Sequence, residues 1–417
     1  MRFIRSITSE GGLLKNAAFL TVADAATKGA TGLLALLIAR YLGPALFGQY
    51  AIASAVGGLF IMATAIGFEQ ELTRRGGIDR DAIPAALRLN FTALLLSSGI
   101  ATAALALFLA IGPYSRFVVF LTLLLWVALV LGRFHFSFRY LSLLRQRAGV
   151  AAVIQSGSTA LLLAATVVAL ARGDGLVTIV GIQVVVAIAT LAAWVWWLPA
   201  GGLGTAPVTL PSLRGFVRRS LPYGISNLIW IAYFNFDAFM LSLMRSESEV
   251  GLYAGVFRIV AIAYIVGFAV SNSITPELFR SYSADRSRYG RLARRLVGGL
   301  FAISVVVAGS LFLLAEPLVT LVIGPEYAHG VLVMQILSAA AFFRLLNFGL
   351  SDLLTTSDRQ TRRVRLESLL LTANIVMNLV LIPRFGAEGA ALATLAAEAV
   401  LLLGVLWSCL RARLLSP

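Results

Sequence analysis

Long apolar stretches dominate this sequence and restrict the folds that it can adopt. Each has about the 20 residues that a helix needs to cross a hydrocarbon core. We place twelve such stretches, at residues 17–39, 47–68, 87–111, 117–138, 149–171, 176–198, 221–244, 252–275, 296–323, 331–355, 366–382 and 389–410. They do not show the two-residue alternation of a membrane β-barrel wall. Because backbone groups in lipid are satisfied only within helices or closed barrels, we predict an all-α polytopic membrane protein.

Composition excludes an ordinary soluble domain and several kinds of chemistry. Charged residues make up 13% of the chain, about half the share typical of soluble proteins. The single cysteine, Cys409, excludes an internal disulfide framework and any multi-cysteine metal site. The sequence has no phosphate-binding loop with its lysine, which argues against ATP hydrolysis. We expect no enzymatic activity, no metal and no bound cofactor.

Basic residues alternate between the connections of the predicted spans. One set of connections and both termini hold most of them, whereas the other set holds only Arg40, Arg116, Arg172, Arg245 and Arg384. The positive-inside rule then places the basic connections and both termini in the cytoplasm. Twelve spans agree with two termini on the same side. We interpret the net charge of +15 as a topology signal and predict no nucleic-acid partner.

A stretch rich in glycine and proline follows the sixth predicted span and interrupts the helical pattern. We predict an N-terminal six-helix lobe at 1–199, a cytoplasmic linker at 200–216 and a C-terminal six-helix lobe at 217–417. The two halves resemble each other faintly, since FGQY at 47–50 opens the second span and VGLY at 250–253 opens the eighth. Internal repeats of this kind are typical of transporters and place the substrate site between the halves.

Two charges lie inside the first predicted span. Asp24 and Lys28 are four residues apart, so they share one helix face and can pair. Charged groups at membrane depth are costly and tend to face a bundle interior or a wet cavity. The pair is either a coupling element for transport or a neutralised pair that holds the helix in its bundle. Glu69 and Glu71, beside two arginines at the end of the second span, we interpret as an interfacial charge cluster.

Two arginines lie inside later spans, Arg258 in the eighth and Arg344 in the tenth. Together with Lys28, they are the only basic residues that we place in the membrane core. We predict that these three line a cavity for an anionic head group, because the planar guanidinium suits phosphate oxygens. Asn347 and Asp352 fall on the same helix face as Arg344. The alternative is a buried ion pair between Arg344 and Asp352.

The remaining polar residues inside the spans are candidate coupling or cavity residues. Asn227, Asn235 and Asp237 in the seventh span either bind sugar or hold helices together. Glu398 in the last span is a lone carboxylate within an apolar run. Burial disfavours its charged form, so we expect Glu398 to be neutral or to carry a proton.

Three motifs in a fixed order connect this chain to a known family. They are IARYLGP at 38–44 followed by FGQY, IGPEY at 323–327, and LIPRFGAEGAALAT at 381–394. With the span count, they resemble the polysaccharide transporter branch of the multidrug/oligosaccharidyl-lipid/polysaccharide exporter superfamily. The resemblance implies two six-helix lobes in a V, with the first, second, seventh and eighth spans lining a central cavity. Lipid II flippases are similar too but have two further helices, which twelve spans do not provide.

The resemblance also implies a function. Members of this branch resemble Wzx-type flippases, which move undecaprenyl-pyrophosphate-linked sugar repeats across the bacterial cytoplasmic membrane. We therefore expect a multi-pass inner-membrane flippase for O-antigen, capsule or exopolysaccharide repeat units, working by alternating access among the membrane lipids. A polysaccharide polymerase or chain-length machinery is the expected protein partner. Because no ATP site is present, proton or sodium coupling is the candidate energy source.

Two other classes of function remain to be compared with this one. The first is a cation-coupled multidrug or small-molecule exporter of the same fold. Organic cations would favour carboxylates and aromatic residues in the cavity, whereas the predicted intramembrane basic residues favour an anion. The second is a membrane glycosyltransferase or polymerase, which commonly carries a large extracytoplasmic loop with acidic catalytic residues. All the predicted outside loops are short.

Overall fold

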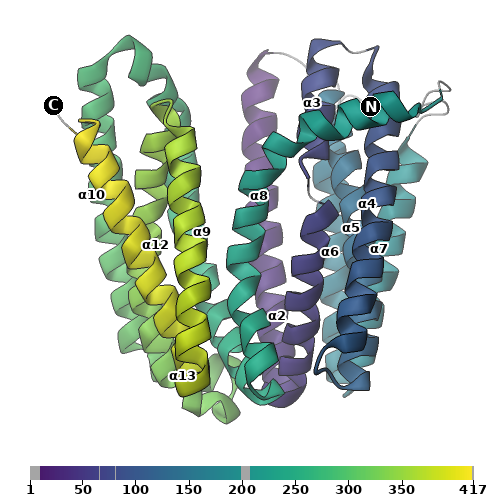
Figure 1. Cartoon of the computed structure of the whole chain (residues 1–417), viewed down its shortest axis with the longest axis vertical. Coiled ribbons are helices and arrows are strands. Elements are labelled where there is room, and N and C mark those ends of the chain that lie inside the picture. The colour runs from purple at the N-terminus through teal and green to yellow at the C-terminus, as the bar shows by residue number, and fades with distance from the viewer. Residues whose placement is uncertain (1–9, 65, 80, 199–206, 416–417) are drawn as a thin grey trace. The chain divides into compact units, whose positions relative to one another are not determined.

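The computed structural model describes the backbone of residues 10–64, 66–79, 81–198 and 207–415 (Figure 1). Within these ranges, the side chains of 10–25, 28, 222, 225–227 and 230 also lie outside the description. The described chain is helical, with elements α2 (Glu10–Ile61), η1 (Met62–Thr64), α3 (Phe68–Ile78), α4 (Ile83–Ile111), α5 (Arg116–Leu144), α6 (Ala148–Ala171), α7 (Leu176–Trp197), α8 (Leu210–Met244), α9 (Glu247–Ala284), α10 (Arg286–Leu313), α11 (Ala315–Pro317), η2 (Leu318–Ile323), η3 (Pro325–Gly330), α12 (Val331–Thr356) and α13 (Gln360–Arg411).

The predicted all-α membrane fold is confirmed. Nine helices of the described ranges are long and apolar enough to cross a membrane. Two of them are 50 and 52 residues long: Gln360–Arg411 contains the last two predicted spans, and Gly29–Ile78 contains the second predicted span and the end of the first. In α8 only a shorter apolar part, Ile231–Met244, is found among the described residues. Counting the two long helices twice and adding α8 reproduces the predicted twelve spans.

Glycine and proline break the two long helices. In α2, Gly43 has φ 69° and ψ 174° and is followed by Pro44. In α13, Gly386 has φ 56° and ψ −130°, three residues after Pro383. Positive φ is accessible to glycine at little cost, and proline removes a helical hydrogen bond. Each break therefore lets one continuous run of helix turn back as two spans.

The secondary structure adds detail to two predicted segments. The end of the proposed linker, 210–216, is helical, because α8 begins at Leu210. Pro211 is compatible with this start, since proline is tolerated in the first turn of a helix. The ninth predicted span, 296–323, is not one helix: α10 ends at Leu313, and the remaining apolar residues form α11 and η2.

The chain divides into two compact units. Unit 1 contains Met1–Leu34 and Ala53–Asn235, and unit 2 contains Ala35–Ile52 and Phe236–Pro417. The middle of α2 around the Gly43 break therefore packs with the second half of the sequence. The proposed lobes at 1–199 and 217–417 follow sequence order and remain a prediction.

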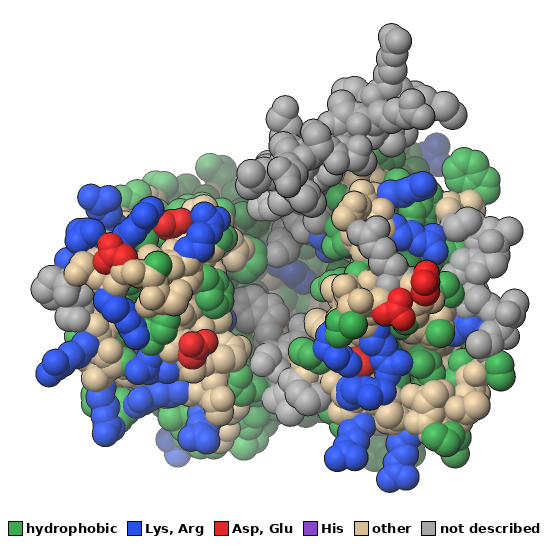
Figure 2. Space-filling model, turned by 90° about the horizontal axis from the view of Figure 1, so that it is seen from above, with side chains coloured by type: hydrophobic (Ala, Val, Ile, Leu, Met, Phe, Trp, Pro, Cys, Tyr) green, Lys and Arg blue, Asp and Glu red, His purple; other side chains and the backbone are tan. Residues whose placement is uncertain are grey.

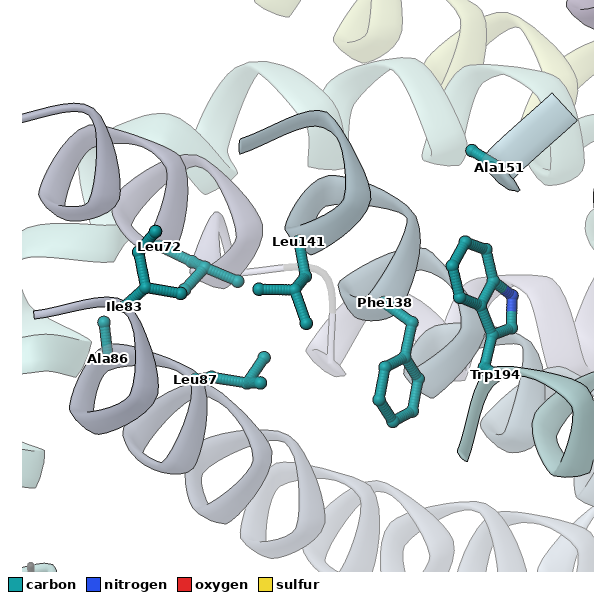
Figure 3. Packing of buried hydrophobic residues seen from close by; sticks show 8 residues of the cluster. All are labelled: Leu72, Ile83, Ala86, Leu87, Phe138, Leu141, Ala151 and Trp194. Carbon is teal, nitrogen blue, oxygen red and sulfur yellow. The ribbon is translucent and has the colours of Figure 1, made fainter. Parts of the chain in front are cut away.

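The core of unit 1 joins five helices (Figure 3). Its buried residues come from α3 to α7: Leu72, Ile83, Ala86, Leu87, Phe138, Leu141, Ala151 and Trp194. Trp194 stacks nearly parallel on Phe138, with the ring planes 8° apart. Its indole N–H donates to His135 Nδ1 at 2.7 Å. Because the buried indole donor has a partner, this aromatic core is stable without a buried charge.

The charged residues of α3 form a cluster at one end of unit 1. The carboxylate of Glu71 is fully buried and contacts Arg74 at 2.7 Å, Arg75 at 2.8 Å and Arg219 at 3.4 Å. Glu69 pairs with Arg133 at 2.7 Å. In each unit, arginines dominate among the charged side chains at the helix ends seen in Figure 2. The predicted clustering of Glu69 and Glu71 with arginines is confirmed, and its place at the membrane interface stays a prediction.

Candidate functional site

A buried carboxylate in unit 2 gathers polar side chains from three helices. Asp237 of α8 is 6% exposed. It accepts hydrogen bonds from Tyr253 Oη of α9 at 2.7 Å and from two groups of α13, Asn378 Nδ2 and Thr394 Oγ1, each at 2.6 Å. Asn374 extends the cluster, because its Oδ1 accepts from Asn378 at 3.1 Å. We call these five residues the Asp237 cluster.

The break in α13 makes this cluster possible. Asn378 lies before Gly386 and Thr394 lies after it, so the two halves of α13 approach Asp237 from the same helix. Gly389 allows the halves to lie close together, since a Cβ there would overlap the carbonyl of Leu381. A straight helix would carry Asn378 and Thr394 about 24 Å apart along its axis.

The charge of Asp237 has no counterion among the described residues, since all three of its donors are neutral. Nearby, Asn378 Oδ1 and Asn374 Nδ2 are buried without a hydrogen-bond partner in the described chain. Buried carboxylates are costly unless they are paired or protonated. Carboxylate, amide and hydroxyl oxygens also suit hard cations. The Asp237 cluster therefore has the chemistry to hold a proton or a small monovalent cation.

A second buried network links α12 to the last part of α13. Arg344 pairs with Glu398 at 3.0 Å, and their side chains are 5% and 0% exposed. Asn347 Nδ2 donates to the same carboxylate at 2.8 Å and to the Glu398 carbonyl at 3.0 Å. The guanidinium also lies 5.1 Å from the centre of the Phe348 ring.

This network corrects two expectations. Glu398 is not a lone carboxylate, because Arg344 and Asn347 bind it. The alternative pairing of Arg344 with Asp352 is wrong. Asp352 instead accepts from Ser271 at 2.6 Å and Thr275 at 2.9 Å and pairs with Arg363 at 3.3 Å. Helical spacing put Arg344 and Asp352 on one face two turns apart, but a guanidinium reaches a facing helix more easily.

The other predicted site residues are placed separately. Arg258 on α9 is exposed and forms no ion pair with any described residue. Asn235 is partly buried and donates to the Ile231 carbonyl at 2.8 Å on its own helix. The side chains of Asp24, Lys28 and Asn227 lie outside the described residues. The cationic lining of Lys28, Arg258 and Arg344 therefore stays a prediction.

The two repeated motifs meet within unit 2. A Cβ on Gly48 would overlap the carbonyl of Glu247, and a Cβ on Gly251 would overlap the carbonyl of Pro44. Pro44 precedes Gly48 by four residues and Glu247 precedes Gly251 by four, so the contact is reciprocal. Gln49 Nε2 also donates to Glu247 at 2.7 Å. We call this contact the glycine clasp.

The other sequence motifs surround the glycine clasp. Arg40 donates to the carbonyls of Leu321 and Val322 at the end of η2. Tyr327 Oη donates in return to the Ala39 carbonyl at 3.1 Å. These bonds satisfy carbonyls that helix ends leave without partners.

Arg245 at the end of α8 has the same role toward α13. Its guanidinium donates to the Ile382 carbonyl at 2.9 Å and to the Pro383 carbonyl at 2.7 Å, just before the Gly386 break. All three motifs that carried the family resemblance therefore stabilise helix breaks at one end of unit 2.

Sequence reasoning missed part of the Asp237 cluster. Tyr253 and Thr394 lie within the sequence motifs at 250–253 and 381–394, whereas Asn374 and Asn378 lie outside every motif. Their signal was the four-residue spacing of Asn374 and Asn378 in an apolar run, together with a carboxylate, Asp237, that has no basic residue within one helical turn.

Comparison with known proteins supplies the family. Residues 13–281 match the family described as polysaccharide biosynthesis protein. The chain is 32% identical over 182 residues to a probable flippase, AglR, of Haloferax volcanii. This match covers 42% of the chain and only 37% of the relative.

Two solved structures share the fold. One is an inward-facing multidrug resistance MATE family transporter of the MOP superfamily, with a TM-score of 0.75 and 15% identity over 93% of this chain and 95% of that one. The other is the lipid II flippase MurJ in an inward closed conformation, with a TM-score of 0.73 and 14% identity over 93% and 87%. At such low identity, these similarities establish the fold alone. From the family match, which spans more than half of the sequence, the chain belongs to the polysaccharide biosynthesis protein family.

Proposed function

We propose that the chain is a flippase that moves polyprenyl-pyrophosphate-linked oligosaccharide repeat units across the cytoplasmic membrane. The family match over residues 13–281 carries this proposal, and the similarity to a probable flippase supports it. O-antigen, capsule and exopolysaccharide units are the candidate cargoes. A polysaccharide polymerase or chain-length machinery would use the product on the outer side.

The alternative, a multidrug exporter, has less support. The fold does not separate the two functions, because a multidrug transporter and a lipid flippase resemble the chain almost equally. A pocket for organic cations needs accessible carboxylates. Asp237 and Glu398 are both buried and hydrogen-bonded. Arg258 instead offers an exposed cation within an apolar helix, which suits a diphosphate.

Alternating access requires a contact that one state makes and the other breaks. The glycine clasp is our candidate for that contact. It brings together segments from both halves of the sequence, and it has backbone atoms in direct contact. Transport would require the clasp to separate, and the neighbouring bonds from Arg40, Arg245 and Tyr327 would keep the helix ends intact as it does.

We assign coupling to an ion gradient to the Asp237 cluster. Binding a proton or a sodium ion would neutralise Asp237, and losing it would leave a buried charge. Because Tyr253 lies only two residues beyond Gly251, a change at Asp237 acts on α9 next to the glycine clasp. Ion binding can in this way bias one of two states.

The proposed function is tested in cells that lack the gene. They should accumulate lipid-linked oligosaccharide facing the cytoplasm, and the wild-type chain should restore export. Arg258→Gln should reduce export at least tenfold, while Arg258→Lys restores it in part, because an ammonium cannot reproduce the bidentate fork. Arg172→Gln, which removes an exposed arginine at a helix end, is the matched control. Normal export without the gene would overturn the proposal.

A further inference from the structure

Both ends of α13 meet at an exposed tryptophan in unit 2. Arg362 lies in the first turn of α13, whereas Trp407 and Arg411 lie in its last turns. The Gly386 break folds the helix back, so that these ends come together. Leu366 confirms the approach, since its side chain would lie 2.8 Å from a Cβ on Gly404.

Two guanidinium groups share the Trp407 ring. The carbon at the centre of the Arg362 guanidinium lies 4.8 Å from the ring centroid, and that of Arg411 lies 5.3 Å from it. Trp407 is 56% exposed. Each cation is attracted by the aromatic face, but two like charges on one ring repel each other. Neither arginine forms an ion pair with a carboxylate of the described chain, so an anion is missing from this arrangement.

An apolar stripe leads away from the two arginines. Leu403 and Leu410 are 68% and 57% exposed, and they flank Trp407 at helical spacing on one face of α13. Trp407 lies in the last turn of an apolar span, where tryptophan marks the boundary between hydrocarbon and head groups. The surface therefore has a cationic end and an apolar side, which matches an amphiphile with an anionic head.

We propose that Arg362, Trp407 and Arg411 bind the phosphate group of an anionic phospholipid. The two planar guanidiniums would hold the phosphate oxygens, and the acyl chains would lie along Leu403 and Leu410. The phosphate would also relieve the repulsion between the arginines. The substrate's own lipid carrier has the same phosphate chemistry, so the test must separate the two sources.

The test measures lipid retention by the full chain. The protein is placed in nanodiscs of phosphatidylcholine with phosphatidylglycerol at one-tenth mole fraction, and bound lipid is identified by native mass spectrometry. Wild-type protein should retain phosphatidylglycerol. Arg362→Gln/Arg411→Gln should bind it about tenfold more weakly, since loss of a charge-assisted bond removes about 1.4 kcal/mol or more. Trp407→Leu should also weaken retention, because the ring positions both arginines.

The matched control removes two charges in the N-terminal turns of α10 and α13. Arg365→Gln/Arg295→Gln changes two exposed arginines, neither of which is among the two that lie over Trp407, and it should retain phosphatidylglycerol. A second arm adds undecaprenyl phosphate. If undecaprenyl phosphate displaces phosphatidylglycerol from the wild-type protein but not from Arg362→Gln/Arg411→Gln, the carrier lipid is a ligand of the same phosphate site. Equal phosphatidylglycerol retention by wild type and Arg362→Gln/Arg411→Gln would overturn the proposal, whatever the chain transports.

Discussion

The two units use charge in different ways. Among the residues whose side chains are described, unit 1 keeps its ion pairs at one end of its helices. Glu71 pairs there with Arg74 and Arg75 on its own helix and with Arg219 of α8, and Glu69 pairs with Arg133 of α5. Unit 2 instead buries Arg344 against Glu398, which is 54 residues away on another helix. It also holds Asp237 among donors from two other helices.

The difference indicates where a change of state can start. The arginines of the unit 1 pairs are partly exposed, so water can solvate and screen their charge when a partner is neutralised. A buried pair between helices fixes how those helices pack, and neutralising one partner leaves an unpaired buried charge. Unit 2 therefore holds the groups to which we assign coupling in our proposal, and the glycine clasp lies in the same unit.

The largest expected effect comes from the buried pair of unit 2. Glu398→Gln should lower the free energy of unfolding by about 3–5 kcal/mol, because Arg344 would remain charged and buried. Glu69→Gln in unit 1 is the matched control and should cost about 1–2 kcal/mol, since Arg133 is partly exposed. Thermal unfolding of the purified proteins in detergent measures both.

A double variant checks this prediction. Arg344→Met/Glu398→Leu should recover most of the lost stability, because apolar residues of similar size can replace a buried ion pair. Equal losses for Glu398→Gln and Glu69→Gln would remove the contrast between the units.

The next effect concerns the glycine clasp. Gly251→Ala should be destabilising by about 1–3 kcal/mol in the clasped state, because the new methyl meets backbone atoms that cannot turn away. We expect transport to fall sharply. In a Cys409→Ser background, Gln49→Cys should react faster with an impermeant maleimide when Gly251→Ala is present than when it is absent.

Gly99→Ala on α4 of unit 1 is the control for that experiment. Nothing lies within 4 Å of a Cβ at Gly99, and alanine favours helix over glycine by about 1 kcal/mol. Transport by Gly99→Ala should be unchanged. If Gly251→Ala transports equally well, the clasp is only a packing contact.

The smallest effect on stability is expected for the charged pair of the first predicted span, Asp24 and Lys28. Exchanging the charges, with Asp24→Lys and Lys28→Asp in one protein, should change helix stability by at most about 0.5 kcal/mol. If the pair only holds the helix in its bundle, transport and its pH dependence should survive the exchange. Loss of transport by a folded protein would show that unit 1 also takes part in coupling.

Sequence patterns predicted the features that depend on local order. Span length and apolar runs predicted the helices, and the spacing of Glu71 from Arg74 and Arg75 predicted their ion pairs. Partners between distant helices could not be found in this way. Arg344 and Asp352 share a helix face, but the identity of the facing carboxylate, Glu398, depends on how α12 packs on α13.

The Asp237 cluster shows the same limit. Its donors are 16, 141 and 157 residues away along the chain, and two of them reach Asp237 only because α13 breaks at Gly386. The proline and glycine that mark this break were visible in the motif at 381–394. Nothing in one sequence indicated which polar residues the break would bring together.

Ion-driven translocation in liposomes tests the role of unit 2 most directly. Liposomes are prepared with the purified protein and with polyprenyl-pyrophosphate-linked oligosaccharide. The accessibility of the oligosaccharide to an impermeant oxidant is followed with and without an imposed proton or sodium gradient. We predict that one gradient accelerates translocation by the wild-type chain at least tenfold, and that Asp237→Asn abolishes this acceleration while the protein stays folded. Equal acceleration of Asp237→Asn and wild type would contradict the assignment of coupling to the Asp237 cluster.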